Sequence, residues 1–211
     1  MSTFQQLYTV VIDKLAHGLP AYLTYHNVQH TRNVVEAVTY LAEQEQLSER
    51  DKILVQTAAL FHDSGFLQSH DEHEMLSCKM AQKLLPEYGF TEKEIEQICT
   101  MIMTTKLPQS AVDTLSRILC DADLYYLGTD TYETMASALY LEMKRFNRVK
   151  DEREWLIKQI EFLNDHKYYT DTAKKIMEQG KQNNQTALQE KLNRIMIHTQ
   201  EPKQIVQLVQ D

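Results

Sequence analysis

The chain has 211 residues, of which 43% are apolar and 25% charged, and its formal net charge is −8. The length suits one domain with a sizeable core, and the scarcity of glycine (5) and proline (4) favours long helices over many-turned β architectures. The acidic balance argues against binding to nucleic acid or to an anionic membrane surface. No apolar run approaches the roughly 18 residues of a membrane span, so we expect neither nucleic acid nor a membrane as a partner.

The first residues lack the basic start and the long apolar run of a signal peptide. The three cysteines, Cys78, Cys99 and Cys120, are far apart in the sequence and embedded in apolar helical patterns. They indicate reduced core thiols rather than a disulfide framework. We therefore expect a cytoplasmic protein.

Apolar residues recur at helical spacing almost throughout the chain, and Ser48 with Asp51 and Thr91 with Glu94 form two capping boxes. We predict an all-α, single-domain helical bundle over residues 1–200, followed by a short C-terminal tail over 201–211. The last helix is either continuous or broken near Gly180. The predicted helices cover about 4–16, 28–41, 52–63, 72–85, 91–103, 112–127, 129–150, 151–163 and 172–197.

The third predicted helix, KILVQTAALFHD, is apolar on nearly all sides, which is typical of a helix at the centre of a bundle. It ends in His62 and Asp63, and burying such a pair without a partner is costly. Adjacent helical residues point about 100° apart, so both can reach one ion only where the helix ends, and Gly65 supplies that end. The alternative is an ordinary helix C-terminus with a solvated Asp63.

Asp123 lies at the edge of the apolar stripe of the sixth predicted helix, away from the predicted helix ends. A carboxylate bordering a buried stripe requires a cation, so Asp123 is a candidate ligand. Asp121 points further round and is expected behind the ligands or on the surface, with the role of true ligand as its alternative.

His26 and His30 lie in the segment YHNVQHT at the start of the second predicted helix. If the helix covers both, their spacing puts them on one face, where both could bind one ion. If His26 is still in the loop, it stands beside the ion, free to exchange protons with a substrate. A hydrogen-bonded structural histidine is the alternative for each.

The ordered series YHNxxHT, AALFHDSGF and ILCDADL resembles the HD-domain superfamily of metal-dependent phosphohydrolases, a group that includes cyclic-nucleotide phosphodiesterases. The resemblance covers roughly residues 19–127. It implies that a divalent metal ion (Fe, Mn, Co, Ni, Zn or Mg) is held by His30, His62, Asp63 and Asp123, and that Asp63 belongs to the catalytic set. It also implies that His26 is a general acid toward the leaving-group oxygen.

The same resemblance makes His73, Glu74 and Lys106 candidate substrate-binding residues. Many dinuclear members carry two further histidines after the fourth helix, and the TTKLPQS loop has none, so a firmly held second metal is not expected. The basic run after residue 143 is typical of a solvated helix end. The alternative is that Arg145 or Arg148 reaches a phosphate at the mouth of the site.

The expected function is hydrolysis of a phosphate ester of a nucleotide or similar small metabolite. A homodimer is a candidate oligomeric state of the protein. Cyclic-nucleotide cleavage is a close rival. A non-catalytic nucleotide-sensing module with a structural metal is an alternative of another class, against which the intact His26 argues. A di-iron oxygenase is a further alternative, against which the missing histidines count.

Overall fold

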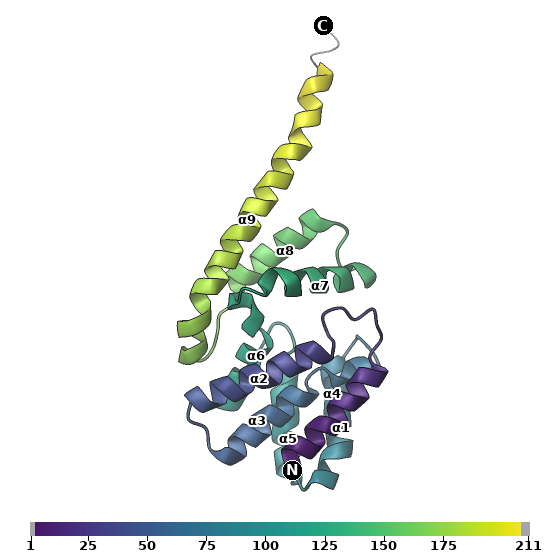
Figure 1. The fold of residues 1–211 in the computed structure, drawn as a ribbon, viewed down its shortest axis with the longest axis vertical. Helices are drawn as coiled ribbons and strands as arrows, with labels where there is room; N and C mark the ends of the chain where they lie inside the picture. Colours follow the sequence, from purple (N-terminus) through teal and green to yellow (C-terminus); the bar gives the residue numbers. More distant parts are fainter. Residues whose placement is uncertain (1–2, 208–211) are drawn as a thin grey trace.

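The structure is a computed structural model that describes the backbone of residues 3–207 and the side chains of residues 3–197 (Figure 1). It confirms the predicted all-α fold: the described residues form α-helices and short 3₁₀ helices, without a strand. None of the described helices is long and apolar enough to cross a lipid bilayer. The α-helices are α1 (Thr3–Gly18), α2 (Val28–Gln44), α3 (Glu49–Phe61), α4 (His73–Leu84), α5 (Glu92–Thr104), α6 (Thr114–Asp123), α7 (Tyr132–Arg145), α8 (Glu152–Asp165) and α9 (Asp171–Gln207).

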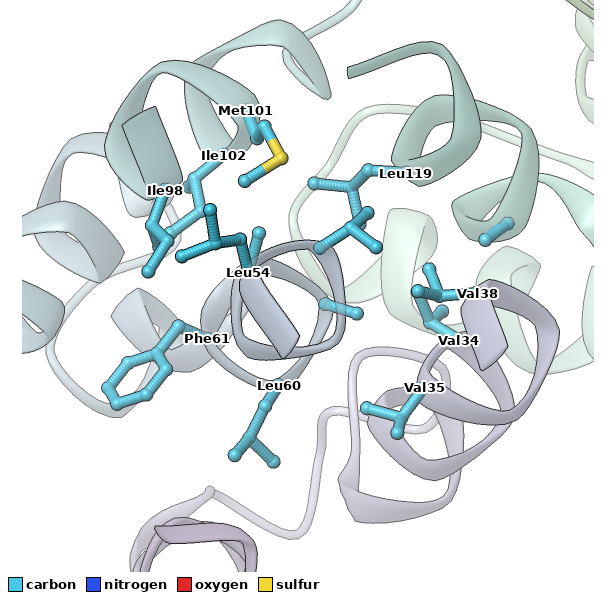
Figure 2. Close-up of a cluster of buried hydrophobic side chains, with 14 of the residues drawn as sticks. Val34, Val35, Val38, Leu54, Leu60, Phe61, Ile98, Met101, Ile102 and Leu119 are labelled. Carbon is cyan, nitrogen blue, oxygen red and sulfur yellow. The ribbon is translucent and has the colours of Figure 1, made fainter. Parts of the chain in front are cut away.

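Helix α3 is the centre of a body formed by α1 to α6, as its apolar sequence predicts. Figure 2 shows side chains from three neighbouring helices around it. Leu60 and Phe61 of α3 are fully buried. Their partners include Val34 and Val38 from α2, Ile98, Met101 and Ile102 from α5, and Leu119 from α6.

A second layer contains α7, α8 and most of α9, and Figure 1 shows it stacked on the α1–α6 body, with α9 running past α8 and projecting from the molecule. It has its own apolar cluster, which consists of Leu124, Leu127, Tyr132, Ala136, Leu156, Leu163, Leu188 and Leu192. The expected tail over 201–211 begins within α9, and its residues 208–211 lie outside the described chain.

The sixth helix ends at Asp123, and the prediction of a helix to residue 127 was wrong. The chain continues as the 3₁₀ helix η3 (Tyr125–Gly128). The premise that Asp123 lies away from a helix end was therefore also wrong. Asp123 is the last residue of α6, and the backbone leaves the helical conformation at the next residue, Leu124.

Asp121 fastens α6 to the connection between α8 and α9, and its full burial corrects the expectation of a surface position. Its side chain is fully buried and accepts hydrogen bonds from the amides of Tyr169 (2.7 Å) and Thr170 (2.8 Å) and from the Thr170 hydroxyl (2.7 Å). Burial raises the pKa of this carboxyl, although the three donors act in the opposite direction. Asp121 thus satisfies main-chain donors within the fold.

Helix α9 continues without a break through Gly180. At this glycine α9 crosses η3, and the two backbones lie in close contact. A Cβ atom on Gly180 would lie 1.9 Å from the carbonyl oxygen of Gly128, and a Cβ on Gly128 would lie 2.4 Å from the carbonyl oxygen of Met177. The two glycines let main chain pack directly on main chain. Gly180 therefore marks a close contact instead of the break that its low helix propensity suggests.

We predict that Gly180→Ala lowers the free energy of unfolding by about 1–3 kcal/mol, because the added methyl group meets backbone that cannot rotate away. Helix propensity alone predicts the opposite sign, a gain of up to about 1 kcal/mol. Urea denaturation followed by circular dichroism measures the difference. Gln182→Ala, at an exposed position two residues on, is the control and should change stability little. A Gly180→Ala protein at least as stable as the wild type would contradict the close contact.

Candidate metal centre

Residues from three helices of the first layer meet at one point. His30 is the third residue of α2, and its position is fixed by Asn27, whose side-chain oxygen caps the helix by accepting from the amides of Gln29 and His30. His62 directly follows α3, and Asp123 ends α6. The helix ends thus bring together side chains from a segment that extends from residue 30 to residue 123, a separation of 93 residues.

Four side chains with potential ligand atoms converge at this point. The Nε2 atoms of His30 and His62 are 3.2 Å apart. Oδ1 of Asp123 lies 3.2 Å from the first nitrogen and 3.4 Å from the second. Oδ2 of Asp63 lies 3.3 and 3.2 Å from the same two atoms. His30, His62 and Asp123 each offer a ligand atom within 4.8 Å of the other two, so they are positioned to bind a metal ion.

The charges of this cluster are tightly linked. Burial opposes protonation of His30 and His62, but the two adjacent carboxylates outweigh it and raise the pKa of both imidazoles. Burial likewise opposes ionisation of Asp63, yet the charge of His62 and the proximity of the His30 imidazole hold its pKa well below the usual range. The pKa of Asp123 is lowered in the same way. The carboxylates favour positive charge at this point.

The donor set fits a divalent cation. Oδ2 of Asp63 is buried and accepts no hydrogen bond, although it faces two imidazole nitrogens. A buried acceptor left in that state is costly, and a cation would satisfy it. Two imidazoles with two carboxylates match the preferences of divalent Fe, Mn, Co, Ni and Zn better than those of Ca.

The turn after α3 is held by a fully buried serine. Ser77 of α4 donates a hydrogen bond to the carbonyl oxygen of His62 (2.7 Å) and accepts one from the amide of Gly65 (2.8 Å). A Cβ on Gly65 would lie 2.0 Å from the carbonyl oxygen of His73. Nδ1 of His62 lies 2.7 Å from the carbonyl oxygen of Ala59, and donation there leaves Nε2 as the nitrogen with a free lone pair.

His26 lies in the loop before α2, beside the cluster. Its ring centroid is 6.0 Å from that of His30, and it is not among the three residues whose ligand atoms converge. Its Nδ1 contacts Oε1 of Glu142, a fully buried residue of α7. The other carboxylate oxygen accepts from the amides of Tyr25 (3.0 Å) and His26 (3.1 Å).

Sequence reasoning missed Glu142. Burial opposes its ionisation, but the hydrogen bond and charge of His26 and the two amide bonds lower its pKa, so the carboxylate is ionised. A signal was present, because Glu142 shares the buried face of α7 with Tyr132 and Ala136. A carboxylate on such a face requires a partner.

The predicted substrate-binding residues differ in their placement. Nε2 of His73 lies 3.6 Å from Oδ1 of Asp63 and 3.5 Å from Oε1 of the buried Glu74, so this pair borders the cluster. Phe66 stacks against both His26 and His73, with ring centroids 4.4 and 4.2 Å away. Lys106 is exposed in the loop after α5 and takes no part in the contacts of the cluster.

The basic end of α7 lies against the loops beside His26 and His73. The Arg145 guanidinium lies 5.5 Å from the ring centroid of Tyr22, and Phe146 packs against His70 with centroids 4.1 Å apart. Arg148 is 3.6 Å from Oδ1 of Asp71, and both side chains are exposed. This end of α7 therefore adds positive charge near the loop that carries His70 and Asp71, which precedes His73.

Comparison with known proteins agrees with this geometry. Residues 27–126 match the HD domain family. A predicted HD superfamily hydrolase from an uncultured Thermotogales bacterium is similar in structure, at 18% identity and a TM-score of 0.59, over 92% of this chain and 91% of its own. Bacillus subtilis YpgQ, solved in complex with ADP, is similar at 18% identity and a TM-score of 0.60, over 95% of this chain and 96% of its own.

At 18% identity the two structures show a shared fold and no more. No curated protein matches the chain. The matched segment begins at the helix cap before His30 and ends three residues after Asp123, so it contains the whole converging set. Residues 27–126 therefore belong to the HD domain family, and the chain as a whole shares the all-α fold of the two similar structures.

Proposed function

We propose that the protein is a metal-dependent phosphohydrolase that cleaves a phosphate ester of a nucleotide or similar small metabolite. The observation that carries this proposal is the His26–Glu142 pair, which stands beside the ligand cluster without belonging to it. A metal held only as a structural staple needs no proton donor next to it. The pair therefore favours catalysis over the nucleotide-sensing alternative.

His30, His62, Asp63 and Asp123 would hold one divalent cation, whose identity lies among Fe, Mn, Co, Ni, Zn and Mg. When bound, such an ion supplies an acidified water as nucleophile and polarises a phosphoryl oxygen. The fold would hold these four side chains in place before the ion binds. His30, His62 and Asp123 are anchored at helix ends, and Asp63 lies in the turn that Ser77 holds by hydrogen bonds.

His26 would act as the general acid toward the leaving-group oxygen. Its Nδ1 is engaged by the Glu142 carboxylate, which leaves Nε2 to deliver a proton. Glu142 orients the ring through this contact and holds the loop through two further bonds to main-chain amides. His73 and Glu74, which border Asp63, are proposed to contact the substrate. For Lys106 this role stays a prediction.

A nucleotide is the proposed substrate class because a phosphorylated molecule suits the centre and because the similar YpgQ structure contains ADP. In a chain of net charge −8, an anion needs local positive charge, and Arg145 and Arg148 supply some beside the loops of His70 and Asp71. Cleavage of a cyclic nucleotide is the alternative within the same mechanism. A panel of nucleoside mono-, di- and triphosphates and cyclic nucleotides, each assayed with several added metals, tests the proposal, and inactivity on all of them would oppose it.

Asp63→Ala is expected to remove the metal and to lower hydrolysis about 10³-fold or more, because the ion contributes several kcal/mol of transition-state stabilisation. Metal analysis of purified protein by mass spectrometry gives the bound content, and Asp165→Ala, at an exposed position on α8, is the matched control. Equal metal content in the Asp63→Ala and wild-type proteins would remove Asp63 from the ligand set.

The two histidines of YHNVQHT should separate in their effects. We predict that His30→Ala loses the metal, whereas His26→Ala retains it and loses roughly 10²–10⁴-fold in kcat, the range typical of a general acid. Glu142→Gln should also retain the metal and lower kcat, because the amide holds the ring of His26 less firmly than the carboxylate does. Loss of metal from His26→Ala would show instead that His26 is a ligand.

A further inference from the structure

Two of the three cysteines meet between α4 and α5, although they are 21 residues apart in the sequence. The Cys78 thiol donates to the carbonyl oxygen of Cys99 at 3.5 Å, and the Cys99 thiol donates to the carbonyl oxygen of Cys78 at 3.7 Å. Each sulfur therefore lies against the backbone of the other cysteine. Disulfide formation requires this kind of close approach between two backbones.

The two thiols differ in their access to solvent. Cys78 is 7% exposed, whereas Cys99 is only partly buried. Both line a surface hollow of about 470 Å³, whose walls include Met75 and Met103, 37% and 40% exposed respectively. A small molecule can reach Cys99 through this hollow, which the more deeply buried Cys78 also lines.

The two thiols also differ in acidity. The neighbouring Cys99 thiol and the burial of Cys78 raise the pKa of Cys78. The neighbouring Cys78 thiol lowers the pKa of Cys99 against the smaller opposing effect of burial. A more acidic, accessible thiol next to a second cysteine is the arrangement of an attacking and a resolving thiol.

We propose that Cys78 and Cys99 are a redox-active pair that forms a reversible disulfide by exchange with a small-molecule disulfide such as oxidised glutathione. The Cys99 thiolate attacks one glutathione sulfur, which forms a mixed disulfide and releases the first glutathione as thiolate. Cys78 then gives up its proton and attacks the Cys99 sulfur, which releases the second glutathione. In sum, two protein thiols are oxidised to one disulfide and one oxidised glutathione is reduced to two thiols.

Cys120 takes no part in this exchange. It is fully buried, and its thiol donates to the carbonyl oxygen of Thr104 at 3.4 Å. Burial raises the pKa of Cys120 to about 12. The chain thus contains an unreactive thiol that serves as an internal reference.

The disulfide would join α4 to α5 one residue away from Ser77, the side chain that holds the turn carrying His62 and Asp63. It needs neither the metal nor a substrate. Its test is therefore independent of the proposed phosphohydrolase activity, and either proposal can fail without the other.

The test is to incubate the reduced, folded protein with excess oxidised glutathione and to count free thiols and measure intact mass. We expect the thiols to fall from three to one, with the loss of two hydrogen atoms, no bound glutathione and no dimer, and full reversal by a reducing agent. Three remaining thiols, or a wild-type protein that keeps glutathione bound, would overturn the proposal.

Single substitutions assign the two roles. Cys78→Ser should trap glutathione on Cys99, because no resolving thiol remains, whereas Cys99→Ser should stay unmodified. Cys120→Ser should still form the cross-link. Alanine variants at the same positions, checked by thermal unfolding, replace any serine variant that fails to fold. Glutathione trapped on Cys78, or a cross-link lost with Cys120, would contradict the assignment.

Discussion

The burial of a His-Asp pair at the end of the most apolar helix is the constraint on which the rest of the site depends. Helix α3 is the centre of the first layer, so His62 and Asp63 emerge where water does not compensate their charge. Three other features of the fold answer this constraint. His30 and Asp123 arrive at helix ends, Ser77 secures the turn, and Gly65 leaves space for the main chain of His73.

The second layer contributes to the site through one buried carboxylate. Glu142 of α7 accepts hydrogen bonds from two consecutive amides of the loop before α2 and contacts the ring of His26. The ligand cluster is built wholly from the first layer, and the proposed proton donor is positioned from the second. The relative placement of the layers therefore sets the geometry between the cluster and His26.

The sequence predicted the features that depend on local pattern. The central role of α3 and the start of α2 near His30 follow from apolar periodicity. The meeting of His30, His62 and Asp123 was implied by the resemblance to the HD-domain superfamily. The features it did not predict depend on contacts between distant segments. Glu142 meets its partner 116 residues away, Asp121 satisfies donors 48 and 49 residues on, and Cys78 approaches Cys99 only because α4 packs on α5.

The contact between Gly128 and Gly180 has a consequence for how the sequence of this protein can vary. Main chain meets main chain there, so a side chain added at either glycine clashes with backbone. A later change at the other glycine cannot relieve the clash. The crossing point is thus closed to stepwise substitution from either side. Elsewhere along α9, where side chains interlock with side chains, a change in one residue can be matched by its neighbour. The register between α9 and η3 is therefore the feature of the second layer that is least able to change as the amino-acid sequence diverges.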